Sequence, residues 1–154
     1  MFRQISRFFL KGFSTRLEIE GRLLEQVSKT KLLGLLVRDD LTWHENTENI
    51  VHKAYQRMSI LRNLFDFNLP VIELLDVYIL YIRSVIEQSS VVWSSSITVE
   101  ERQDIERIQK VALRIILKEN YVSYENVLCI TGLLTLQERR LQLSRNFAKK
   151  CVNS

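Results

Sequence analysis

Two adjacent aspartates, Asp39 and Asp40, are the residues whose type and spacing come closest to a catalytic arrangement. Paired aspartates in a tight hairpin hold the Mg²⁺ ions of nucleic-acid polymerases, where two metals stabilise the attacking and leaving oxygens. The usual pattern is aromatic-x-Asp-Asp, but residues 37–40 read VRDD, which lacks the aromatic and adds a cation. No earlier acidic residue stands in a context that would supply the further carboxylate. We therefore interpret the pair as the end of a strand before a helix, whose N-terminal dipole favours negative charge.

The other groups that could do chemistry are few. His44 and His52 lie eight residues apart, about two helical turns, without a third metal ligand nearby. Solvated helix histidines are therefore the better interpretation. No serine stands in a nucleophile-elbow context, and no glycine-rich loop could cradle a phosphate. The sequence predicts no active site and no metal or cofactor site in this chain.

Basic side chains recur at helical spacing in two places. Four cations three and four residues apart fall on one face of a predicted helix, and such a row could follow a phosphate backbone as point charges. The competing interpretation is a solvated face, because Glu100 and Glu106 lie nearby and dilute the field. The second place is the basic side of the last predicted helix. The candidate nucleic-acid-binding residues are Arg107, Lys110, Arg114 and Lys118 in the first row and Arg145 and Lys149 in the last helix.

Composition limits the class of protein. The 154 residues are 46% hydrophobic, enough for one core, and one proline with four glycines favours long helices. The net charge of +4 equals that of the first 17 residues, which hold four basic and no acidic side chains. The rest is balanced, so a nucleic-acid argument must rest on local faces. Charges interrupt the most apolar helix, which excludes a membrane span. Cys129 and Cys151 are expected to be free thiols in a reducing compartment, cytoplasmic or nuclear.

The elements that position these residues change in character near residue 42. Residues 15–27 alternate and predict a β-hairpin that turns at Gly21, with residues 32–37 as a buried third strand. Thr42 and Glu45 form a predicted capping box at a helix start. We expect a mainly α fold, in which a small N-terminal β-hairpin or three-stranded sheet (residues 15–41) precedes a bundle of about five helices (residues 42–154).

Five helices are predicted, over residues 43–65, 70–88, 98 to 117 or 118, 124–130 and from 135 onward. Capping boxes open the third and fifth, Gly132 ends the fourth, and residues 89–97 form a serine-rich connector. The second helix has one narrow polar stripe, so it is expected to be covered on most sides. The predicted core residues are Ile50, Ala54, Met58, Leu61 and Phe65 in the first helix, Ile105, Ile108, Ala112, Ile115 and Ile116 in the third, and Leu136, Leu143, Phe147 and Cys151 in the fifth.

Residues 1–14 are aromatic, basic and free of acids, and three interpretations stay open. A targeting sequence and a membrane-surface helix both have this composition. The interpretation we favour is the remnant of a longer upstream domain.

Five segments in order resemble one protein family. They are KLLGLLVRDDLTW, KAYQRMSILRNL, LYIRSVIEQSSVVW, ERIQKVALRII and LQERRLQLSRNFAKKC, within residues 31–151. Together the landmarks resemble the downstream part of the reverse transcriptase of non-LTR (LINE-type) retrotransposons. In that family a K-x-LG strand closes the palm, and a helical thumb and post-thumb region follow.

The resemblance has four implications. Asp39 and Asp40 match a polar pair downstream of the catalytic aspartates, which would lie before residue 1. The chain would then be a thumb-side fragment of an RNA-directed DNA polymerase, without the Mg²⁺ of the parent enzyme. Its partners would be a template–primer duplex, held by its backbone, and the missing palm domain. Gln88 stands where the family often has tyrosine, so packing around Trp93 is expected to be looser.

Two other hypotheses stay open. One is a helical protein-interaction module that binds through apolar surface. The other is a non-functional retroelement remnant, against which the consistent core faces and three capping boxes argue.

Overall fold

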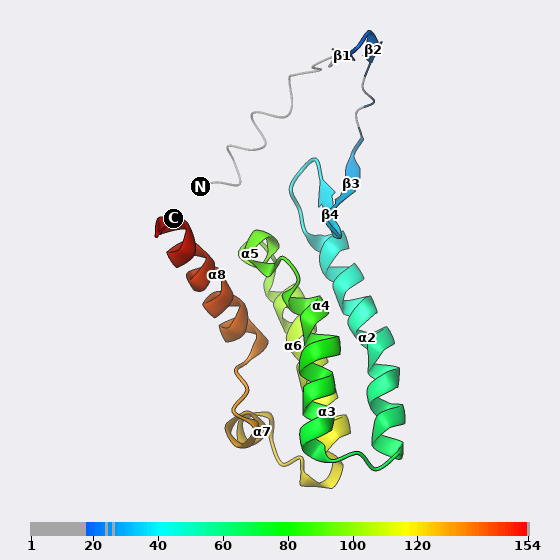
Figure 1. Ribbon diagram of the computed structural model, residues 1–154, viewed down its shortest axis with the longest axis vertical. Helices are drawn as coiled ribbons and strands as arrows, with labels where there is room; N and C mark the ends of the chain where they lie inside the picture. The colour runs from blue at the N-terminus through cyan, green and yellow to red at the C-terminus, as the bar shows by residue number, and fades with distance from the viewer. Residues whose placement is uncertain (1–17, 24, 26, 154) are drawn as a thin grey trace. The chain divides into compact units, whose positions relative to one another are not determined.

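The computed structural model describes residues 18–153 apart from residues 24 and 26. The chain divides into two compact units between Trp43 and His44. The first contains short strands and the second is helical (Figure 1). The mainly α fold with a small N-terminal β region is therefore confirmed. The interpretations of residues 1–14 lie outside the described residues.

The N-terminal unit contains two separate hairpins. β1 (Glu18–Ile19) pairs antiparallel with β2 (Arg22–Leu23), and β3 (Lys29–Leu32) pairs antiparallel with β4 (Leu35–Arg38). The predicted hairpin at Gly21 is confirmed. The predicted third strand over residues 32–37 is wrong because Leu33 and Gly34, with φ of 49° and 88°, form a two-residue turn inside it. Hairpin turns with two positive φ values match the twist of the paired strands.

The helical unit contains every helix that the sequence predicts. The segment predicted as one helix over residues 70–88 is continuous in its path, but its middle is a π-helix. A short helix also lies within the predicted connector. The elements are α2 (His44–Asp66), α3 (Val71–Val77), the π-helix η1 (Tyr78–Arg83), α4 (Ser84–Glu87), α5 (Ser90–Trp93), α6 (Val99–Leu117), the 3₁₀-helix η2 (Lys118–Asn120), α7 (Tyr124–Thr131) and α8 (Leu136–Val152).

Local capping explains where several helices begin and end. Thr98 with Glu101 opens α6, and Thr135 with Glu138 opens α8, each as a complete capping box. Gly132 ends α7 with φ of 67°, a backbone conformation that glycine adopts without strain. These three predictions are confirmed.

The core lies where α6 meets α2 and the α3–α4 segment, and α8 packs beside α5 and α6 (Figure 1). Most of the predicted core face of α2 and α6 is buried. Phe65 and Ile115 are only half-buried, and Leu113 takes the expected place of Ile115. The core residues with less than 2% exposure include Ala54, Met58, Leu61, Leu74, Tyr78, Ile82, Ile86, Trp93, Ile105, Ile108, Ala112, Leu113, Ile116, Val127 and Leu136.

The predicted core face of α8 is wrong beyond its first turn. Leu136 is buried, but Phe147 and Cys151 are exposed and Leu143 is half-buried. Arg140, one turn after Leu136, is buried instead. This helix contacts the bundle mainly through its N-terminal half.

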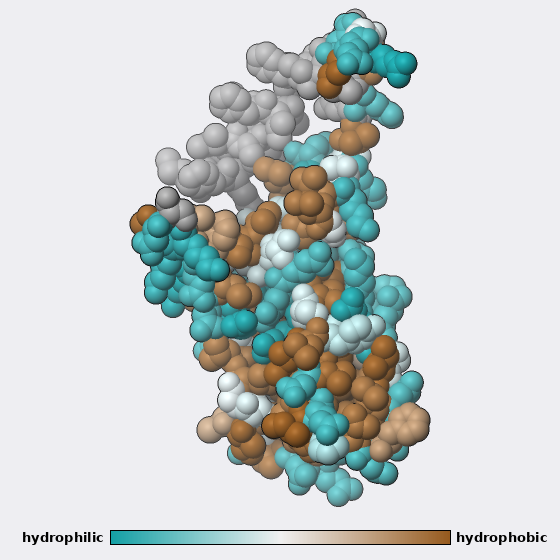
Figure 2. Space-filling view, viewed as in Figure 1, coloured by the Kyte–Doolittle hydropathy of each residue, from teal (hydrophilic) through white to brown (hydrophobic). Residues whose placement is uncertain are grey.

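The prediction that the second helix is buried on most sides is also wrong. Ile72 and Leu80 are 68% and 75% exposed. Figure 2 shows apolar side chains gathered over α3 and the end of α2. The expected loosening near Gln88 is contradicted, because Trp93 is fully buried and its Nε1 donates to the Gln88 carbonyl at 3.1 Å. A backbone acceptor does not depend on the side chain at position 88.

Candidate nucleic-acid interface

The cation row starts on α6 and ends just past it. Arg107, Lys110 and Arg114 belong to the helix, whereas Lys118 is its C-terminal cap, with φ of 41°. The first three therefore keep the predicted common face, and Lys118 departs from the helical path. Arg107, Arg114 and Lys118 are exposed, and Lys110 is half-buried.

Three of the four cations lie over the faces of aromatic rings. The Lys110 ammonium lies 5.0 Å from the centre of the Tyr124 ring, and the Arg114 guanidinium 5.2 Å from that of Tyr121. The Lys118 ammonium lies 3.9 Å from the centre of the Phe65 ring. A ring face attracts a cation without neutralising its charge, so these groups are oriented but remain positive.

Arg107 differs from the other members of the row. Its Nη1 donates to Asp104 Oδ1 at 2.9 Å, across one helical turn. Within the described part of the chain, it is the only row member with a carboxylate at ion-pair distance. An exposed pair of this kind contributes little and is readily exchanged for another anion.

The cations of α8 have different roles. Arg145 and Lys149 are exposed, as a phosphate contact requires. Arg139 instead donates from Nε to Glu87 Oε1 at 3.0 Å, which joins α8 to α4. Arg140 is 3% exposed, and its Nη1 has no hydrogen-bond partner among the described residues. Sequence reasoning missed Arg140, although it lies four residues from Leu136 on the same helical face.

A buried hydrogen-bond network lies behind the row. The hydroxyl of Tyr78 donates to Gln109 Oε1 at 2.7 Å. Gln109 Nε2 is 2.8 Å from the hydroxyl of Tyr124 and 2.9 Å from the carbonyl of Leu134, and donates to both. The Tyr124 hydroxyl in turn donates to Glu106. The network connects η1, α6, α7 and the loop before α8.

Both network tyrosines stay protonated well above neutral pH. Burial raises the pKa of Tyr78 well above its ordinary value. Burial and the hydrogen bond to Glu106 raise the pKa of Tyr124. Each phenol can therefore act as a hydrogen-bond donor throughout the neutral range.

Glu106 caps α8 from a neighbouring helix. Its Oε1 accepts from the N–H of Leu136 at 3.1 Å, and its Oε2 from the N–H of Gln137 at 3.3 Å. These N–H groups belong to the first turn of α8 and have no partner within that helix. Of the two carboxylates interpreted from sequence as diluting the positive field, Glu100 and Glu106, the second is therefore engaged by a helix N-terminus.

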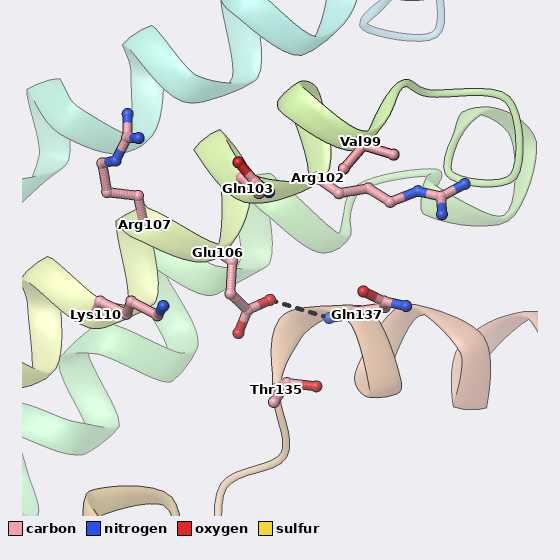
Figure 3. Close-up of a pocket in the computed structure, with 8 residues that line it drawn as sticks. All are labelled: Val99, Arg102, Gln103, Glu106, Arg107, Lys110, Thr135 and Gln137. Atoms are coloured by element: carbon pink, nitrogen blue, oxygen red, sulfur yellow. Dashed lines mark hydrogen bonds between the residues drawn. The ribbon is translucent and has the colours of Figure 1, made fainter. Parts of the chain in front are cut away.

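A pocket of about 540 Å³ opens beside Glu106, between α6 and the start of α8 (Figure 3). Three cations line it, Arg102, Arg107 and Lys110, of which the last two also belong to the row. Its other lining residues are Val99, Gln103, Glu106, Thr135 and Gln137. Seven of these eight lining residues have a polar or charged side chain, and three of the seven are cations, so an anionic ligand finds donors there.

Asp39 and Asp40 lie in the loop after β4, as the strand-end interpretation predicts. Asp40 Oδ1 accepts from the Thr42 N–H at 3.0 Å and hydroxyl at 2.7 Å, and from Arg38 Nε at 3.3 Å. The hydrogen bonds from Thr42 and the charge of Arg38 lower the pKa of Asp40. An oxygen engaged by three donors beside a cation does not fit a magnesium ligand, and no catalytic step is assigned to it.

The remaining candidates stay separate from these features. His44 Nδ1 lies 3.2 Å from Glu101 Oε1, and Nε2 lies 3.3 Å from Glu48 Oε1. Cys129 and Cys151 are free and exposed. No three His, Cys, Asp or Glu side chains gather as a metal site among residues 18–153 without 24 and 26. None of the described helices is long and apolar enough to cross a membrane.

Comparison of the chain with protein families, with curated proteins and with solved structures found no match.

Proposed function

We propose that the helical unit binds the phosphate backbone of a nucleic-acid duplex through the cation row, as the thumb-side part of a non-LTR reverse transcriptase. The observation that carries this proposal is that the cations of Lys110, Arg114 and Lys118 lie over aromatic rings. A solvated face of a structural helix would be expected to pair its cations with carboxylates at i±4. Rings instead orient the charges and leave them available to phosphate oxygens.

The spacing of the row suits one strand of a duplex. Arg107, Lys110 and Arg114 fall on successive turns and span about 10 Å of helix axis. One cation per turn can meet successive phosphates of a strand that runs along α6. Backbone contacts of this kind fix position and carry no base sequence. The chain would therefore hold a duplex by charge and shape, and the catalytic aspartates would belong to a palm domain outside this sequence.

Salt dependence of duplex binding tests the proposal. Four phosphate contacts predict a slope of about −3.6 in a plot of log K against log salt. Fluorescence anisotropy with the full chain and an RNA–DNA hybrid measures it, with RNA and DNA duplexes compared alongside. Lys110→Gln, Arg114→Gln and Lys118→Gln should each reduce the magnitude of the slope by about 0.9. Arg62→Gln, at an exposed position of α2, is the matched control and should leave it unchanged.

A triple Gln variant that binds with unchanged affinity and slope would refute the proposal. Two further variants, Arg145→Gln and Lys149→Gln, test whether the basic side of α8 also contacts the duplex. If it does, each variant should reduce the magnitude of the salt slope.

A second candidate function rests on the exposed apolar side chains of the helical unit. Phe67, Ile72 and Leu80 are 77%, 68% and 75% exposed, and apolar exposure concentrated on one face is typical of protein-binding surfaces. A helical protein-interaction module would bind its partner with little dependence on salt. It would tolerate the row variants and respond to polar substitutions at these three positions.

A further inference from the structure

The pocket beside Glu106 is positive although a carboxylate lies in it. Arg102, Arg107 and Lys110 line it against a single acid. Both oxygens of Glu106 are already engaged, by the Tyr124 hydroxyl and by two N–H groups of α8. Figure 3 shows the Lys110 ammonium directed toward that carboxylate, whereas the Arg102 side chain extends away from it. The cations therefore exceed the anionic charge available to them inside the pocket.

Two guanidinium groups next to this pocket lack the partners that arginine usually has. Arg102 makes no side-chain hydrogen bond or ion pair within the described residues. Arg140 is buried, with 3% of its surface exposed, and its Nη1 has no hydrogen-bond partner among the described residues. Arg140 lies one turn along α8 from Leu136, whose N–H donates to Glu106 in the pocket lining. Burial lowers the pKa of Arg140, and the charge of Arg102 lowers it further while that of Glu106 opposes the shift. A buried, unpaired N–H of a charged group is costly, and an anion held nearby would offset the repulsion between the two arginines.

We propose that this pocket binds a phosphate monoester, the terminal phosphate of a strand that lies along the cation row. The inference rests on the proposed function, because Arg107 and Lys110, the first two members of the row, also line the pocket. An internal phosphodiester has a nucleotide on each side, and the open face of α6 suits it. A monoester has one covalent link, so it can enter a pocket. Its charge of about −1.5 to −2 lets it interact favourably with more cations than a diester can.

The side chains present match the oxygens of such a group. A guanidinium offers planar paired donors to phosphate, and an ammonium offers a compact charge. Arg102 and Lys110 supply one of each. The amides of Gln103 and Gln137 add neutral donors at the rim.

Three forms of one RNA–DNA hybrid test the inference in the anisotropy assay: one with a 5′-phosphate, one with a 3′-phosphate and one with hydroxyl ends. One phosphorylated form should bind about tenfold more tightly than the hydroxyl form, the effect of one charge-assisted hydrogen bond. Arg102→Gln should abolish this preference and leave the hydroxyl form bound as before. Arg114→Gln should weaken all three forms and preserve the ratio, and Arg62→Gln should change neither.

Equal affinity for all three forms would overturn the inference while the proposed function stands. If no duplex binds, the proposed function fails, and a titration with inorganic phosphate followed by NMR decides the chemistry of the pocket. A saturating shift of the Gln137 amide that is lost in Arg102→Gln would support a phosphate site supplied by free phosphate. Absence of that shift would overturn the site as well.

Discussion

Replacing Gln109 by leucine should destabilise the helical unit without changing its shape. Gln109 is fully buried in α6, and its side-chain amide makes three hydrogen bonds. Leucine has a similar volume and a comparable helix propensity, so packing and helix formation change little. The substitution isolates the loss of polar partners from the loss of volume.

The expected magnitude follows from what each partner loses. The Tyr78 hydroxyl is fully buried and has no other partner among the residues that the structure describes, so Gln109→Leu leaves it with the desolvation cost of an unsatisfied group, about 2 kcal/mol. The Tyr124 hydroxyl keeps its bond to Glu106. The carbonyl of Leu134 belongs to an exposed residue and can turn to water. We expect Gln109→Leu to lower the free energy of unfolding by about 2 kcal/mol.

Urea denaturation followed by circular dichroism at 222 nm measures this loss, with Gln103→Leu at an exposed position of α6 as control. The double variant Tyr78→Phe/Gln109→Leu removes both partners, which costs far less than leaving one unpaired. Its loss should fall at least 1 kcal/mol short of the summed single losses. A Gln109→Leu loss below about 0.5 kcal/mol, or strictly additive effects in the cycle, would refute a satisfied buried network.

Three further predictions concern the same unit. The folded-state pKa values of Tyr78 and Tyr124 lie above the unfolded value near 10, so the free energy of unfolding keeps their full contribution below pH 10 and falls above it. The fall is at most about 1.4 kcal/mol per pH unit for each tyrosine. Urea midpoints between pH 9 and 11 check this, and Tyr78→Phe should make the fall with pH less steep. Glu106→Gln should cost about 1–2 kcal/mol, because an amide nitrogen cannot accept from the N-terminus of α8; thermal melts compare it with Glu119→Gln, which should be neutral. Trp93→Ala should lower the free energy of unfolding in urea by about 3–5 kcal/mol, and a loss below about 1 kcal/mol would mean that α5 is not part of the core.

The features predicted correctly from the sequence are those that depend on neighbours along the chain. The boxes at Thr98 and Thr135 need only a residue three positions later. The end of α7 needs only Gly132. The same local chemistry was available at Leu33 and Gly34, where a glycine inside an apolar run marks a two-residue turn. Treating that run as one strand gave the wrong sheet.

The features that were missed depend on contacts between distant segments. The apolar pattern of α8 predicts a core residue at position 147, but Phe147 is exposed, and the buried residues of α8 are Leu136 and Arg140 near its start. The polar Gln109 lies on the buried side of α6 because partners from η1, α7 and the α7–α8 loop satisfy it. Periodicity alone cannot indicate such partners.

The candidate interface combines both kinds of information. The spacing of Arg107, Lys110 and Arg114 can be seen in the sequence, and it places the three on one helical face. What decides whether that face is positive is the environment of each charge, which comes from Tyr121 and Tyr124 after the helix. One acid beside the row, Glu106, accepts hydrogen bonds from the first turn of α8, whereas Asp104 pairs with Arg107. A net charge near zero for the body of the chain is therefore compatible with a local phosphate-binding face, because Lys110, Arg114 and Lys118 lie against rings and have no carboxylate at ion-pair distance among the described residues.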